Sequence, residues 1–174
     1  MIDELFNKFN SYNMIDWGVI AIGVSGIPGV AERLHHSIIK DFASQELEKM
    51  PSDDPLFDVV VGLAAGTDGE DSSELRDSLE TICQAKHIDV DNSKRKWRFV
   101  LLENSISNLD PDPVYGLIKL SEFWSAWGWP TDAPASMRRN DSKMSSLEYH
   151  SQSNYEYVIK DHQEWLVAEL ALLQ

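Results

Sequence analysis

The chain has 174 residues, of which 29 are acidic and 15 basic, and its formal net charge at pH 7 is −14. This charge argues against nucleic acid or an anionic membrane as a direct partner, because phosphate groups would be repelled. A single cysteine excludes an internal disulfide framework, and neither a basic signal peptide nor an apolar run of about 18 residues is present. We therefore expect one cytoplasmic domain over residues 1–174, with its own hydrophobic core.

Helical periodicity predominates along the chain. Between Gly- and Pro-rich breaks, apolar residues recur three or four positions apart, as on one face of an amphipathic helix. Two short apolar runs, residues 14–24 and 56–64, fit either a buried helix or a buried strand. The predicted fold class is all-α (mostly α), a compact single-domain bundle of about seven or eight helices. The clearest expected helices cover residues 1–10, 37–50, 73–87, 92–109, 113–128 and 153–173.

Polar residues and prolines before these runs predict where the helices begin. We expect Ser37, Asn92 or Ser93, and Ser153 to act as N-caps, and Pro113 to open the helix that follows it. The periodicity also predicts which residues face the core. For the helix at 73–87 these are Leu75, Leu79, Ile82 and Cys83; for the helix at 113–128, Val114, Leu117, Ile118, Trp124 and Trp127; for the last helix, Tyr155, Val158, Ile159, His162, Trp165 and Leu166.

The negative charge is concentrated in the middle third of the chain. Residues 41–91 contain 14 acidic and three basic residues, a net charge of −11 out of the total of −14. One interpretation is a solvated surface that aids solubility. The other is a docking surface that speeds the capture of a cationic partner.

The motifs of common enzyme and cofactor sites do not occur in the sequence. The Gly-rich stretch at 23–29 matches neither a dinucleotide fingerprint nor a Walker loop. The adjacent His35 and His36 would point about 100° apart on a helix, and H-E-x-x-H is missing. His162 and Cys83 lie on apolar stripes, where a core role is favoured. We predict no catalytic residue, cofactor or metal ligand, although a metal site built from distant residues stays possible.

Tryptophans form the densest aromatic group, between residues 123 and 129. Trp124 and Trp127 fall on one helix face and are expected in the core. Trp129 follows Gly128, which should end the helix, so its side chain is expected at the surface. An exposed tryptophan is typical of a protein-binding hot spot.

The C-terminal half contains K-W-R at 96–98, D-P-x-Y-G-L at 112–117, E-F-W-x-x-x-G-x-P at 122–130 and H-x-E-W at 162–165. With this pattern the chain resembles a bacterial family of unknown function, for which no catalytic residue is implied. In size and acidity it is also similar to immunity proteins of polymorphic-toxin and contact-dependent growth inhibition systems. Such proteins bind and neutralise a cognate toxin, frequently a basic nuclease.

The leading hypothesis is therefore an immunity protein that occludes the active site or substrate groove of a cationic toxin. An adaptor that binds another protein is the alternative, and a metal-dependent enzyme is a weaker one. The oligomeric state stays open. The expected partner-binding residues are Asp68, Glu70, Asp71, Glu74, Asp77, Glu80 and Trp129.

Overall fold

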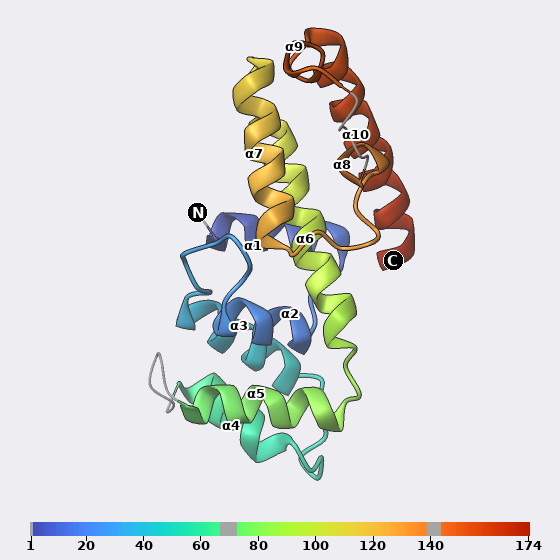
Figure 1. Ribbon diagram of the computed structural model, residues 1–174. Helices are drawn as coiled ribbons and strands as arrows, with labels where there is room; N and C mark the ends of the chain where they lie inside the picture. Colours follow the sequence, from blue (N-terminus) through green and yellow to red (C-terminus); the bar gives the residue numbers. More distant parts are fainter. Residues whose placement is uncertain (1, 67–72, 139–143) are drawn as a thin grey trace. The chain divides into compact units, whose positions relative to one another are not determined.

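Helices make up most of the residues that the structure describes, namely 2–66, 73–138 and 144–174 (Figure 1). In those ranges this computed structural model contains ten helices, eight of them with seven or more residues, and no strand. The predicted all-α class is thereby confirmed. In chain order the helices are α1 (Ile2–Tyr12), α2 (Trp17–Ser25), α3 (His36–Leu47), α4 (Phe57–Ala65), α5 (Ser73–Ala85), α6 (Val90–Ser107), α7 (Pro113–Ala126), α8 (Ala135–Arg138), α9 (Ser146–Tyr149) and α10 (Gln152–Leu173).

The chain forms two compact units, Met1–Trp97 and Arg98–Gln174. Helix α6 belongs to both, because the boundary between the units lies between two consecutive residues in its interior. No helix in the described ranges is long and apolar enough to cross a membrane.

In the first unit, both apolar runs that fitted helix or strand are helices, α2 and α4. Seven of the nine residues of α2 are buried, including Trp17, Val19 and Ile20. A helix that is buried on nearly all sides has no polar face and therefore no helical periodicity in its sequence. This explains why the pattern at 14–24 could not distinguish helix from strand.

Asp16 fixes the start of α2 against α6. Its carboxylate accepts a hydrogen bond from the Val19 backbone N–H at 2.8 Å, which caps the helix, and another from Ser93 Oγ at 3.2 Å. The ammonium group of Lys96 pairs with the other carboxylate oxygen at 2.5 Å. At Gly18 the two helices approach so closely that a Cβ atom would lie 2.2 Å from Ser93 Oγ.

Three of the predicted N-caps are wrong, because each helix starts slightly earlier. His35 caps α3 through its Nδ1, and Ser151 caps α10 through its hydroxyl. At α6, Asp89 accepts hydrogen bonds from the backbone N–H groups of Asp91 and Asn92 at 3.0 and 3.1 Å. Ser93, one of the expected caps, is fully buried against Asp16 instead.

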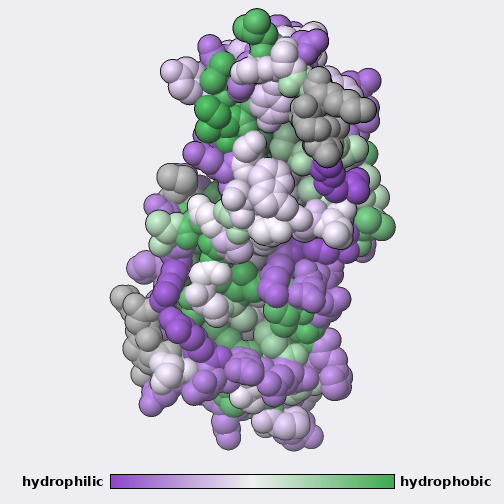
Figure 2. Space-filling model, in the orientation of Figure 1, coloured by the Kyte–Doolittle hydropathy of each residue, from purple (hydrophilic) through white to green (hydrophobic). Residues whose placement is uncertain are grey.

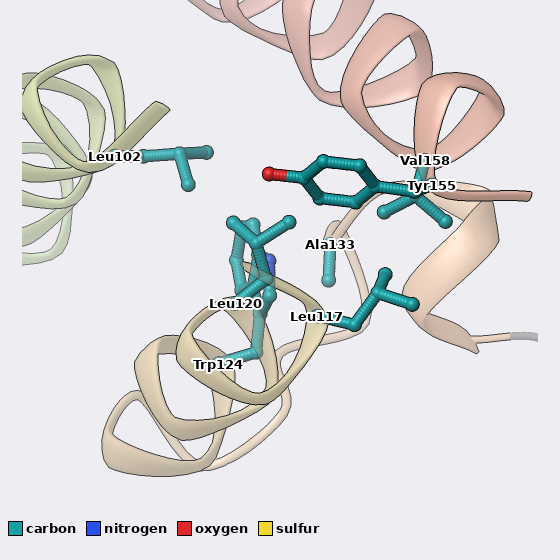
Figure 3. Packing of buried hydrophobic residues seen from close by; sticks show 7 residues of the cluster. All are labelled: Leu102, Leu117, Leu120, Trp124, Ala133, Tyr155 and Val158. Atoms are coloured by element: carbon teal, nitrogen blue, oxygen red, sulfur yellow. The ribbon is translucent and has the colours of Figure 1, made fainter. Parts of the chain in front are cut away.

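The core of the second unit forms where α6, α7 and α10 meet (Figure 3). The predicted face of α7 is partly wrong: Leu117 and Trp124 are buried as expected, but Val114 and Ile118 are 39% and 45% exposed. Gly116 joins the buried side instead, because Tyr155 of α10 lies where a side chain would stand. The buried residues of this core are Leu102, Leu117, Leu120, Trp124, Ala133, Tyr155 and Val158.

Candidate protein-binding face

The predicted acidic contacts that lie within the described residues belong to α5. Glu74, Asp77 and Glu80 are exposed, and Figure 2 shows hydrophilic side chains along this helix. Asp68, Glu70 and Asp71, the other predicted acidic contacts, lie outside the described residues. The opposite face of α5 is buried as its periodicity predicts, through Leu75, Leu79, Ile82 and Cys83.

The three carboxylates form a short row on the surface. They are spaced three residues apart, and at 1.5 Å per residue the row is about 9 Å long. Within the described part of the chain, the structure shows no ion-pair partner for the carboxylates of Glu74 and Asp77. Glu80 accepts a hydrogen bond from the neutral Gln84 amide at 3.0 Å. The row therefore presents a concentrated negative charge to an approaching cation.

An apolar hollow of about 490 Å³ adjoins this row. Glu80 belongs to both, and Val90, which is 42% exposed, lines the hollow from the start of α6. An apolar depression bordered by charged groups is typical of a protein interface, in which a buried centre is surrounded by a polar rim. The lining residues come from α2, α5 and the segment that leads into α6: Ala21, Ser25, Arg76, Leu79, Glu80, Cys83, Gln84, Ile88 and Val90.

Cys83 lies in the floor of the hollow and is 6% exposed. Burial raises the pKa of its thiol, and the negative charges of Asp16 and Glu80 raise it further. A thiol that stays protonated at neutral pH is a poor nucleophile. The prediction that Cys83 is a core residue is confirmed by its burial.

Three other acidic residues in the 41–91 segment have local partners. Asp54 accepts a hydrogen bond from the Leu56 backbone N–H at 2.8 Å, and Asp89 caps α6. Asp91 pairs with Lys94 at 2.9 Å, an exposed pair that contributes little to stability. These carboxylates have roles within the fold, whereas the row on α5 faces solvent.

Trp129, the predicted aromatic contact, belongs to the second unit. It follows the end of α7, where Gly128 and Trp129 both have positive φ values, 71° and 51°. The Trp129 backbone N–H donates to the Trp124 carbonyl at 3.0 Å, which closes the helix end. A left-handed conformation costs a bulky residue roughly 1–2 kcal/mol. The side chain is 48% exposed, so its predicted exposure is confirmed, while its binding role stays a prediction.

Arg98 lies in a buried charged and aromatic cluster of the second unit. Its guanidinium carbon is 5.9 Å from the ring centroid of Trp124 and 5.5 Å from that of Trp165. It forms an ion pair with Asp132 and a second one with Glu169, whose carboxylate oxygen is 3.7 Å away. Arg98 and Glu169 are only 6% and 4% exposed, so their ion pair is buried.

His162 adjoins this cluster and is fully buried. Its Nε2 accepts a hydrogen bond from Trp124 Nε1 at 2.9 Å, which leaves Nδ1 to donate to the Val158 carbonyl at 2.7 Å. Both ring nitrogens are therefore satisfied by the neutral imidazole. Burial lowers the pKa of His162, and the predicted core role is confirmed. Among the described residues, no group of three or more His, Cys, Asp and Glu side chains is arranged to hold a metal ion.

Acidification is expected to destabilise the protein through His162. Because the pKa of folded His162 is lowered from its ordinary value of 6.5, the unfolded chain binds a proton more readily than the folded chain. The stability that neutral His162 contributes is fully present above about pH 6.5 and is lost as the pH falls below it. Urea unfolding between about pH 7.5 and 5 should show a steeper loss for wild type than for His162→Gln. Parallel losses would contradict this role.

This cluster unites the sequence patterns that carry the family resemblance. Arg98 comes from K-W-R, Trp124 from E-F-W, and His162 and Trp165 from H-x-E-W. Residues 6–170 match a bacterial family described as "Uncharacterized protein conserved in bacteria (DUF2247)". The chain belongs to this DUF2247 family. Among curated proteins and among solved structures, nothing matches the chain.

In this DUF2247 protein the four pattern residues of the cluster are packing residues. Arg98, Trp124 and His162 are buried and Trp165 is partly buried, so these pattern residues contribute to the packing of the second unit. The hollow beside α5 contains none of these patterns. Its walls come from segments that are distant in sequence, such as Ala21 and Val90, and no local signal indicates that they meet.

Proposed function

We propose that this DUF2247 protein is a cytoplasmic immunity protein that binds and neutralises a cationic toxin domain through α5. The observation that supports this most directly is the row of exposed carboxylates, Glu74, Asp77 and Glu80, beside an apolar hollow. A nuclease groove that binds phosphates is itself basic, so an acidic helix is complementary to it in charge. Occupation of that groove would block the toxin's substrate or active site.

The two parts of the face have different tasks in this proposal. The carboxylates attract the partner over several ångströms and so act mainly on the association rate. The hollow accepts an apolar side chain of the partner, which then loses contact with water and slows dissociation. Rates measured separately can therefore distinguish the two contributions.

Neutralising the row on α5 is expected to slow association with the toxin domain encoded beside this gene. The triple variant Glu74→Gln, Asp77→Asn, Glu80→Gln should reduce the association rate constant about tenfold at low salt and flatten its salt dependence. Stopped-flow or surface-based kinetics measures both quantities. The matched control removes three exposed carboxylates of the second unit, through Glu122→Gln, Glu156→Gln and Glu164→Gln. Equal slowing by both triples would show a general charge effect and contradict an α5 surface.

Co-expression tests the biological part of the proposal. Cells that produce the toxin's C-terminal domain should survive when this protein is present, and survival should fall with Val90→Asp, which puts a charge at the edge of the hollow. No rescue by the wild-type protein would refute the immunity function. If binding of a partner instead depends on Trp129, which is exposed in the second unit, the adaptor alternative is favoured.

A further inference from the structure

A polar groove of about 340 Å³ lies in the first unit, lined largely by α1 and α3. On one side it is lined by Asn7, Asn10 and Asn13, which follow one another at intervals of three residues. All three are exposed, and the structure shows no hydrogen-bond partner for their carboxamides within the described residues. Asn7 and Asn10 lie about 4.5 Å apart along the axis of α1, and Asn13 follows the end of that helix with a φ of 54°.

The other side of the groove is formed by α3. Asp41 and Gln45 are four residues apart and so lie on the same face of that helix. Both are exposed, and neither side chain has a hydrogen-bond or ion-pair partner among the described residues. Glu46 also lines the groove, but its carboxylate pairs with Lys49 at 3.1 Å. The groove thus combines four unengaged carboxamides with one uncompensated negative charge.

This set of groups fits a peptide main chain. Each carboxamide offers two donors and one acceptor, and an extended peptide presents N–H and C=O groups all along its length. A sugar would need an open aromatic face, but Phe6 is 5% exposed and Phe42 packs edge-on against Trp17, with centroids 4.8 Å apart.

We propose that the groove between α1 and α3 binds an extended, lysine- or arginine-containing peptide segment of another protein. The carboxamides hold the main chain, and Asp41 pairs with a cationic side chain. This site is distinct from the row on α5, and the inference does not rest on the immunity function. It gives the first unit a second contact site, which recognises the amino-acid sequence of the partner's peptide.

Nitrogen-15 NMR tests the proposal directly, because Asn and Gln side-chain NH₂ groups give their own signals. The probes are acetyl-Lys-Thr-Lys-Thr-Lys-amide, its counterpart with Glu in place of Lys, and chitotriose, each titrated into the full-length protein. We expect the cationic peptide alone to shift the side-chain signals of Asn7, Asn10, Asn13 and Gln45. Shifts confined to α5, shifts caused by chitotriose only, or no shifts would each overturn the proposal.

Variants separate the groove from general attraction of positive charge. The double variant Asn10→Ala, Gln45→Ala should weaken binding of the cationic peptide about tenfold or more, because two hydrogen-bonding side chains are lost. Gln163→Ala, which removes an exposed amide of α10, is the control and should leave affinity unchanged. Asp41→Asn should weaken binding, whereas Glu48→Gln, outside the groove on α3's end, should not. Equal effects of Asp41→Asn and Glu48→Gln would overturn the assigned charge contact.

Discussion

Replacing Trp124 with alanine is expected to lower the free energy of unfolding by about 3–5 kcal/mol. Its indole is fully buried and packs edge-to-face on Phe123 and Trp165, with ring centroids 5.2 and 5.5 Å away. Alanine would leave a cavity among these rings. It would also remove the N–H that satisfies His162 Nε2, and a buried acceptor without a donor adds to the loss.

Urea unfolding followed by far-ultraviolet circular dichroism measures this effect. Trp129→Ala is the matched control, because it makes the same chemical change in the same unit at a side chain that is 48% exposed. We expect the control to lose less than about 1 kcal/mol. Similar losses for the two variants would contradict the assignment of Trp124 to the core and Trp129 to the surface.

Arg98→Leu is expected to destabilise the protein by about 3–5 kcal/mol, because it removes one partner of a buried ion pair with Glu169. Asp132 can remain hydrated, since its side chain is 45% exposed, but the Glu169 side chain is only 4% exposed. Loss of the buried pair with Glu169 should therefore cost more stability than loss of the half-exposed pair with Asp132. The loss of the stacked guanidinium contacts with Trp124 and Trp165 adds to it.

A double-mutant cycle separates these contributions. Glu169→Leu combined with Arg98→Leu should cost clearly less stability than the sum of the two single losses, because each single variant already breaks the Arg98–Glu169 ion pair. Lys160→Leu breaks an exposed pair with Glu164 and should change stability by less than about 1 kcal/mol. If the double variant is as unstable as the sum of the single variants, the ion pair with Glu169 does not hold the cluster together.

Periodicity predicted the buried face of a helix best where one face is buried and the other is exposed to solvent. On α5 the four expected core residues are all buried. The exposed acidic residues alternate with these apolar residues, and this alternation makes the helical periodicity visible in the sequence. On α2 that contrast is lost, because the helix is buried nearly all round. On α7 the predicted stripe was displaced, because the close contact of Gly116 with Tyr155 sets which face turns inward.

Cap positions were harder to predict, because several neighbouring polar residues can serve. Ser93 has good cap chemistry, yet its hydroxyl bonds to Asp16, a residue 77 positions away. The candidate site was predicted only in part for a similar reason. The acidity of α5 is visible in the sequence, whereas the hollow beside it and the amide groove exist only when separate segments meet.

The sharing of α6 between the two units limits how this protein can be divided. Three consecutive residues of α6 contact different units. In the first unit, Lys96 forms an ion pair with Asp16, and Trp97 donates a hydrogen bond to the Val19 carbonyl. In the second unit, Arg98 forms an ion pair with Asp132. A chain cut in any loop would strip one unit of side chains that it needs. Recombination between DUF2247 genes that keeps both units intact must therefore place the crossover inside α6. The two parts of that helix must also keep the same rotation about the helix axis.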